Sequence, residues 1–264
     1  MEYWTQYKKE TDLGIDFERP DQKTLAGRLL VLGGQANSFF VVANAINTAE
    51  KEKIGDVKAL MPDSLSKKIP NNDRVVFLPS DKSGGFSETA TSLALNSLTQ
   101  ADAMIVIGDM GKNSETIKFL DELLIKNEKD ILLMRDAVDL AISGDNVENW
   151  LEKGNIVLFV SIAQFKKILK AVYYPKVINI TAPVMQLIEV IHKFTLSYSL
   201  TLVIPYGGLI ILAKNGKVMS VKMNQTKYDM LTIFNGELAT KIMKLKMWNV
   251  GKDNLSCFIA GCID

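Results

Sequence analysis

The segment with the clearest chemical pattern runs from Ala103 to Thr116 and reads AMIVIGDMGKNSET. An apolar run ends at Gly108, Gly111 follows in the turn, and Asn113 is placed to cap a helix. This pattern is typical of a strand, a tight turn and a helix start. Such a junction points backbone N–H groups at the space above a sheet, where a phosphate is a natural ligand. A second junction, VLGGQANS, runs from Val31 to Ser38.

Neither junction matches a known phosphate-binding motif in full. The VLGGQANS segment lacks the G-x-G-x-x-G spacing, which disfavours a Rossmann enzyme of hydride transfer. The GDMGKN segment is similar to the end of a P-loop, but Val106 stands at the position of the first glycine. Asn113 also replaces the magnesium-binding Ser or Thr. A tight strand–helix turn without a ligand is therefore an open alternative for both junctions.

Three carboxylates stand where helices are expected to begin. Asp136 and Asp139 follow a predicted strand, and ligands of open α/β sheets gather at the carboxyl ends of the strands. Asp136 either faces such a site or caps a helix, and the sequence does not separate the two. Glu237 lies in the first turn of the last long helix, where a carboxylate also complements the helix dipole.

The chain offers few residues for metal or triad chemistry. His192 is the one histidine, which argues against histidine-rich metal sites and most Ser–His–Asp arrangements, and we expect it at the surface or an edge. Cys257 and Cys262 lack the partners of a zinc site and are expected to be reduced thiols. We therefore expect no metal site built from protein side chains alone.

Length and charge fit one globular domain over residues 1–264, with residues 1–27 as a polar, irregular arm. The net charge of +1 gives no electrostatic case for nucleic acid or an anionic membrane as a partner. The first residues lack the apolar core of a signal peptide, so a cytoplasmic protein is expected. The charge-free stretch from Phe194 to Ala213 contains Pro205 and Gly207, which favour two short strands over a membrane span.

Strands and helices alternate along the first two-thirds of the chain, which predicts a mainly parallel sheet covered on both faces. The helix after the first junction is expected to bury Phe39, Val42, Ala43 and Ile46 and to stop at Gly55. Turn signals near the C-terminal end predict antiparallel hairpin strands there. Strands are expected at 29–32, 57–61, 75–78, 103–107, 131–134, 156–160, 201–205 and 209–213.

Taken together, these elements resemble the ribokinase-like superfamily, which implies a three-layer α/β/α sandwich. Within it the sequence is similar to the ADP/ATP-dependent NAD(P)H-hydrate dehydratase family. The V-I-G-G-S motif of that family corresponds to 31–35, its G-P-G-L-G turn to 107–111, and its D-A-D-A-L to 134–138. The resemblance implies contacts with a dinucleotide substrate at Gly33, Gly34, Gly111 and Asp136.

Other family positions carry different residues here. Ser161 stands at the substrate-contacting histidine of L-T-P-H, and Gln164 at a following glutamate. The L-K-G-A nucleotide loop corresponds to 205–208, where Tyr206 replaces the lysine beside Gly207 and Gly208. Ser161 is assigned to the substrate, and Tyr206, Gly207 and Gly208 to the nucleotide, by this resemblance.

The G-T-G-D motif, which carries the anion hole and the essential aspartate of the family, corresponds to the region of Asn235 and Gly236. In the ungapped register Gly236 occupies the position of the aspartate, and a shift of one residue places Glu237 there instead. The resemblance thus assigns Asn235 and Gly236 to nucleotide binding and Glu237 to catalysis.

The resemblance implies a dehydratase that repairs hydrated NADH and NADPH, with ADP or ATP as the cofactor, Mg²⁺ beside it, and assembly into a homo-oligomer. Loss of the base, the histidine and the lysine implies impaired catalysis, because general acid–base help alone is worth roughly 10²–10⁴-fold in rate. Two alternatives stay open: a degenerate protein of the same fold that binds a nucleotide or acts in assembly, and a small-molecule kinase of the superfamily.

Overall fold

The computed structural model describes residues 2–8, 13, 18–70, 73–229 and 231–263. Its strands form one ten-stranded sheet in the order β1-β10-β9-β8-β7-β6-β5-β2-β3-β4. Pairing is parallel from β8 through β7, β6, β5, β2 and β3 to β4, and antiparallel between β8 and β9 and between β9 and β10. The strands are β1 (Trp4–Tyr7), β2 (Arg28–Gly33), β3 (Asp56–Pro62), β4 (Val75–Leu78), β5 (Ala103–Gly108), β6 (Asp130–Met134), β7 (Ile156–Phe159), β8 (Thr201–Tyr206), β9 (Leu209–Lys214) and β10 (Lys217–Lys222).

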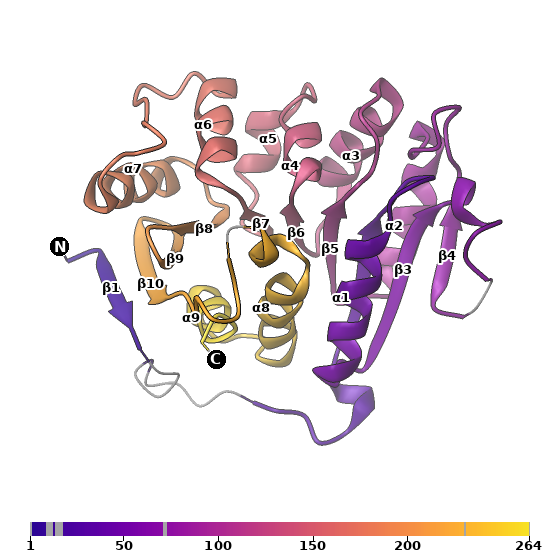
Figure 1. Cartoon of the computed structure of the whole chain (residues 1–264), viewed down its shortest axis with the longest axis horizontal. Coiled ribbons are helices and arrows are strands. Elements are labelled where there is room, and N and C mark those ends of the chain that lie inside the picture. Colours follow the sequence, from indigo (N-terminus) through magenta and orange to yellow (C-terminus); the bar gives the residue numbers. More distant parts are fainter. Residues whose placement is uncertain (1, 9–12, 14–17, 71–72, 230, 264) are drawn as a thin grey trace.

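Helices cover both faces of the sheet, as the alternation predicted (Figure 1). Along β2, Leu30 and Leu32 face the layer built from α2 to α7, while Leu29 and Val31 face α1, α8 and α9. Successive side chains of a strand point to opposite faces, so a run of apolar residues serves two cores. The helices are α1 (Phe40–Lys51), α2 (Thr91–Thr99), α3 (Ser114–Lys126), α4 (Asp136–Ala141), α5 (Val147–Leu151), α6 (Ile162–Ala171), α7 (Val184–Ser197), α8 (Glu237–Trp248) and α9 (Asn254–Ala260).

The N-terminal arm is less irregular than the sequence suggested. Residues 4–7 form β1, which pairs in parallel with β10 and so becomes one edge of the sheet. The Nε1 of Trp4 donates a hydrogen bond to the Oγ of Ser220 at 3.0 Å. Nothing in the local sequence indicates this pairing, because the strands lie more than two hundred residues apart in the chain.

Two helical expectations need correction. The face of α1 that packs on the sheet is rotated by one residue, because Val41, Val42 and Ala45 are buried whereas Ala43 and Ile46 are only half-buried. The helix also ends at Lys51, before Gly55. After α8 the chain forms a further helix, α9, that the sequence analysis did not anticipate.

The charge-free stretch from 194 to 213 divides into the end of α7 and the strands β8 and β9. Within the described residues, no helix combines the length and apolarity needed to cross a bilayer.

Candidate functional site

The turn after β5 is stabilised by a carboxylate of the protein itself. Asp136 is the first residue of α4, directly after β6 and the linking Arg135. Its Oδ1 accepts a hydrogen bond from the backbone N of Asp109 at 2.7 Å, and its Oδ2 accepts one from Met110 at 3.4 Å. The two backbone N–H groups that suggested a phosphate therefore already hold an anion. Asp136 therefore does not cap a helix: the N-cap of α4 is Arg135, and the carboxylate binds the turn after β5 instead.

Arg135 and Asp109 join the ends of β6 and β5. The Nη2 of Arg135 lies 2.8 Å from the Oδ1 of Asp109, and both residues have positive φ, 55° and 56°. Such φ values are uncommon for residues other than glycine and persist where surrounding contacts fix them. Here the carbonyl oxygen of Arg135 also accepts a hydrogen bond from the Nε2 of Gln164 at 2.6 Å.

Glycines from three distant segments meet around Ile107, whose side chain is fully buried. A Cβ on Gly33 would lie 2.8 Å from the Cγ2 of Ile107, and a Cβ on Gly236 would lie 2.8 Å from its Cδ1. The N–H of Gly34 donates to the carbonyl of Gly108 at 3.0 Å. The fold thus brings Gly33, Gly34 and Gly236 together at the carboxyl edge of the sheet.

Gly111 belongs to the same edge, with a contribution from a loop to which the sequence assigned no role. A Cβ on Gly111 would lie 3.2 Å from the Oε1 of Gln35, and one on Gly85 would lie 2.6 Å from the carbonyl of Met110. The Nδ2 of Asn113 donates to the Oγ of Ser83 at 3.1 Å. The glycine loop around Gly85 therefore packs on the turn that follows β5.

Ser161 is the N-cap of α6. Its Oγ accepts a hydrogen bond from the backbone N of Gln164 at 3.2 Å, and the Gln164 side chain returns to the backbone of Ser161. This capping box satisfies N–H groups that the first turn of a helix cannot pair internally. Ser161 and Gln164, which the sequence resemblance aligns with a histidine and a glutamate, are therefore both used in this cap.

Tyr206 closes β8, and Gly207 and Gly208 form the turn of the β8–β9 hairpin. The hydroxyl of Tyr206 donates to the carbonyl oxygens of Ala182 at 2.5 Å and Ile180 at 3.0 Å. The tyrosine thereby ties the hairpin to the segment that precedes α7. Among the described residues, no hydrogen bond joins this turn to the glycines around Ile107.

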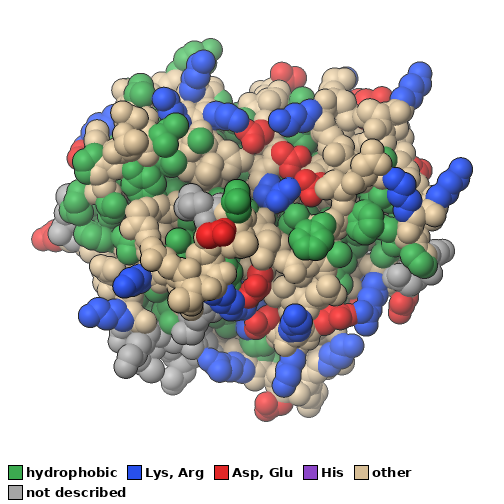
Figure 2. Space-filling model, viewed as in Figure 1, with side chains coloured by type: hydrophobic (Ala, Val, Ile, Leu, Met, Phe, Trp, Pro, Cys, Tyr) green, Lys and Arg blue, Asp and Glu red, His purple; other side chains and the backbone are tan. Residues whose placement is uncertain are grey.

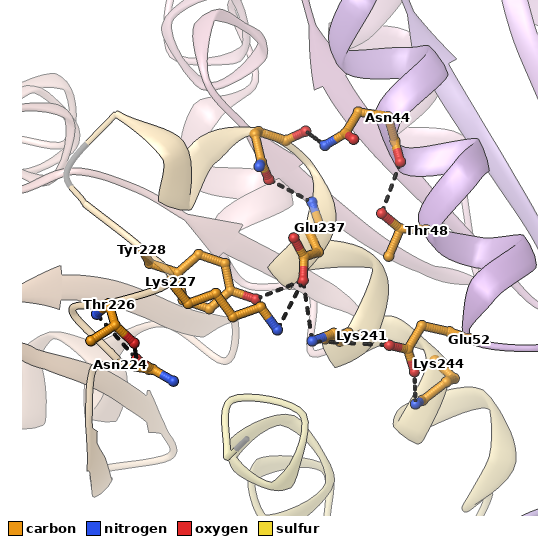
Figure 3. Close-up of polar contacts among 11 residues, drawn as sticks. Asn44, Thr48, Glu52, Asn224, Thr226, Lys227, Tyr228, Glu237, Lys241 and Lys244 are labelled. Atoms are coloured by element: carbon orange, nitrogen blue, oxygen red, sulfur yellow. Dashed lines mark hydrogen bonds and ion pairs between the residues drawn. The ribbon is translucent and has the colours of Figure 1, made fainter.

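The N-terminus of α8 is the second side of the site. Gly236, in the left-handed conformation with φ of 95°, is the N-cap, and the Oδ1 of Asn235 accepts from the N of Glu237 at 2.9 Å (Figure 3). The Nδ2 of Asn44 on α1 donates to the carbonyl of Asn235 at 2.8 Å. Across the described part of the chain, the N–H groups of Leu238 and Ala239 meet no acceptor. They are the free donors of this helix end.

Glu237 points toward cations rather than into open space (Figure 3). Its Oε1 lies 3.1 Å from the Nζ of Lys227 and 3.2 Å from that of Lys241, and it accepts a hydrogen bond from the hydroxyl of the buried Tyr228 at 3.1 Å. Burial raises the pKa of Glu237, but the hydrogen bonds from the two lysines outweigh it and hold the pKa below its ordinary value.

A glutamate held in this way stays ionised and is a weak proton acceptor, because a general base works best with a pKa near the working pH. Lys241 also lies 3.9 Å from Glu52, the residue that follows α1, and Lys244 bonds the same carboxylate (Figure 3). The spacing of Glu237 and Lys241, four residues apart on one helix, is a signal in the sequence that could have revealed part of this network.

Within the described residues, no group of three or more His, Cys, Asp or Glu side chains is placed to hold a metal ion. Cys257 and Cys262 are buried free thiols, as expected, and the Nδ1 of His192 bonds the carbonyl of Gly216 beside the stacked ring of Tyr3.

No protein-family model matches the sequence, and no curated protein matches it. Solved structures do share its fold. A ribokinase-like superfamily protein from Enterococcus faecalis V583 superimposes with a TM-score of 0.75 at 11% identity, over 99% of this chain and 85% of that one.

An ADP/ATP-dependent NAD(P)H-hydrate dehydratase from Bacillus subtilis gives a TM-score of 0.60 at 12% identity, over 96% and 84% of the two chains. Pyridoxal kinase from the same organism gives 0.54 at 13%, over 89% and 88%. At these identities the likeness establishes the fold alone. The protein has the ribokinase-like α/β fold, with a mostly parallel sheet between helical layers.

Proposed function

We propose that the protein binds a nucleotide through its phosphates at the N-terminus of α8, as a divergent relative of the ADP/ATP-dependent NAD(P)H-hydrate dehydratases, and that it turns over slowly or not at all. The observation that carries the proposal is the pair of free N–H groups at Leu238 and Ala239. The first turn of a helix is a favourable place for a phosphate, because its N–H groups and the helix dipole both favour an anion.

Two proteins of the same fold support a nucleotide as the ligand. The Bacillus subtilis dehydratase was co-crystallised with ATP and Mg²⁺, and the pyridoxal kinase was solved as an ADP complex. In this chain the carboxyl edge offers Gly33, Gly34 and Gly111 on one side and α8 on the other. We assign the phosphates of ADP or ATP to the α8 side, with a NAD(P)-type dinucleotide extending toward the glycines.

Mg²⁺ is compatible with this proposal only if the nucleotide phosphates supply most of its ligands. Magnesium in nucleotide sites is held by substrate phosphates, water and one or two carboxylates rather than by a protein cage. Glu237 directly precedes the two free N–H groups in the sequence, and its carboxylate is already paired with Lys227 and Lys241. We therefore expect nucleotide binding that depends weakly on Mg²⁺.

Slow or absent turnover follows from the same residues. The position of the family aspartate is Gly236, which has no side chain, and the neighbouring Glu237 is ionised and enclosed by two lysines. Ser161 and Tyr206, at the family histidine and lysine, are held in a helix cap and a hairpin. No side chain at these four positions is free to move a proton.

The test is calorimetric titration of ADP into the wild type and Asn235→Asp. An aspartate still accepts the hydrogen bond from Glu237 and still caps the helix, but it adds a negative charge where the phosphate binds. We expect about tenfold weaker ADP binding with an unchanged melting temperature. Asn149→Asp, an exposed site on α5, adds the same charge elsewhere and should bind as the wild type does. Equal ADP affinity in all three proteins would show that the phosphates do not bind at the N-terminus of α8.

A working dehydratase is the second candidate, favoured by a carboxylate one residue from the family position. It requires nucleotide-dependent recovery of NADH absorbance from the hydrate, and loss of that activity in Glu237→Gln. A small-molecule kinase is distinguished by ATP consumption on addition of alcohol substrates. Turnover in either assay at the rates of about 1 s⁻¹ or more that are typical of enzymes would refute the proposal of slow or absent turnover.

A further inference from the structure

A groove lies between α6 and residues 172–183, the segment that connects α6 to α7. It is separate from the candidate site at the carboxyl edge of the sheet. The segment arches over the upper part of the molecule before α7 begins (Figure 1). The groove encloses about 610 Å³, within the range of roughly 300–1,000 Å³ typical of small-molecule sites. Its floor and walls are apolar, formed by Leu169, Tyr174 and Ile178 among others.

Large apolar side chains stand exposed along this groove. Tyr173 is 92% exposed, Val177 79% and Ile180 50%. Tyr173 also has a positive φ of 48°, which is unusual for a bulky residue. Exposed apolar side chains that gather in one place mark a binding surface more often than scattered ones do. The water-facing apolar lining is therefore unexplained by the packing of the fold.

Lysines surround the apolar lining. Lys167 is paired with Asp139, and Lys176 is paired with Glu189 at 3.0 Å. Lys166 and Lys170, four residues apart on α6, have no acidic partner among the residues that the structure describes. Like charges at this spacing destabilise a helix slightly, so the two amines carry a cost that an anion would relieve. Figure 2 shows lysine or arginine side chains interspersed with apolar ones over the region of α6 and α7.

We propose that this groove binds an anionic amphiphile: a carboxylate at Lys166 and Lys170, with a single alkyl chain lying against Tyr173, Val177 and Ile180. Charge complementarity selects an anionic head, and the apolar lining selects a flexible chain. A free, medium-chain fatty acid is the occupant that meets both requirements in a groove of this volume. The site is independent of any nucleotide at the carboxyl edge.

The test uses displacement of anilinonaphthalene sulfonate by decanoate, decanol and decyltrimethylammonium, all below their micellar concentrations, with the full-length protein. Decanoate should bind more tightly than decanol, and the cation more weakly than both. From octanoate to decanoate the affinity should rise about fourfold for each added methylene, because the chain is buried.

Variants locate the site. The double variant Lys166→Glu/Lys170→Glu should weaken decanoate about tenfold or more and leave decanol unchanged, whereas Lys217→Glu on β10 should change neither. Val177→Asp should weaken both ligands, and Val250→Asp, at a valine 83% exposed elsewhere, should weaken neither. Melting temperatures confirm that each variant is folded.

The proposal fails if the three ten-carbon ligands bind equally, or if the double lysine variant binds decanoate as the wild type does. It also fails if the protein binds phosphatidylglycerol vesicles but not monomeric decanoate, because that result assigns the surface to a membrane.

Discussion

The Oδ1 of Asp136 accepts a hydrogen bond from the backbone N of Asp109 at 2.7 Å, which places a carboxylate of α4 inside the turn that follows β5. The glycine turn after β5, which the sequence analysis favoured as a phosphate site, thus binds a carboxylate of its own chain. Because this turn is occupied, we assign the proposed phosphate site to the free N–H groups of α8 instead.

Asp136→Ala should lower the free energy of unfolding by about 1.5–3 kcal/mol, because two backbone N–H groups lose a charged acceptor. Asp136→Asn keeps one carbonyl oxygen and should lose less. Urea unfolding measures both. Asp145→Ala removes an exposed carboxylate and serves as the control. If Asp136→Ala and Asp145→Ala unfold alike, the carboxylate does not hold the turn.

Gly108→Ala should be more destabilising than Gly251→Ala. Both glycines have positive φ, 92° and 89°, which costs an alanine about 1–2 kcal/mol at either position. A Cβ at Gly108 also collides with the Oδ1 of Asp136, whereas nothing lies within 4 Å of one at Gly251. The collision should add about 1–3 kcal/mol. Equal losses in urea unfolding would show that the turn relaxes freely around Asp136.

Ser161→Ala should cost about 1 kcal/mol of stability, through loss of the cap on α6. Ser161→Thr keeps a hydroxyl oxygen and should restore most of that loss. If alanine and threonine are equally destabilising, the capping box does not explain the presence of Ser161. Thermal or urea unfolding of the three proteins decides it.

The parts of the fold that the sequence predicted correctly are governed by local signals. The run from β5 through its turn to α3 was readable because Asn113 is a strong N-cap residue, and its Oδ1 does accept from the N of Thr116 at 2.8 Å. The parallel sheet followed from alternation. The pairing of β1 with β10 did not, since it depends on contacts distant in sequence.

The sequence indicated which residues lie at the candidate site, but it did not indicate what each of their side chains contacts. The structure brings the glycines at 33 and 236 together against Ile107, and the roles of these glycines toward a ligand stay predictions. Whether Asp136 faced a ligand or a backbone depended on the exact course of two loops. Lys227 and Tyr228 reach Glu237 through the loop before α8, which no spacing rule describes.

The pairing of Glu237 with Lys227 and Lys241 predicts a dependence of stability on pH. The pKa of Glu237 is lowered in the folded state, so its pairing with Lys227 and Lys241 contributes fully above the ordinary value of 4.5 and is lost as the pH falls through the lowered pKa. The wild type should exceed Glu237→Gln in stability at neutral pH, and the difference should shrink below about pH 4.5. A difference that grows toward acid pH would contradict the direction of this shift.

Ligand-induced stabilisation tests the central claim most directly. The melting transition of the wild type is followed with ADP, ATP, NADH and NADPH, each with and without Mg²⁺. We predict that at least one of them, at 100 times its dissociation constant, raises the free energy of unfolding by about 2.7 kcal/mol and is recovered unconsumed. An unchanged transition at millimolar concentrations of all four ligands would contradict nucleotide binding at α8.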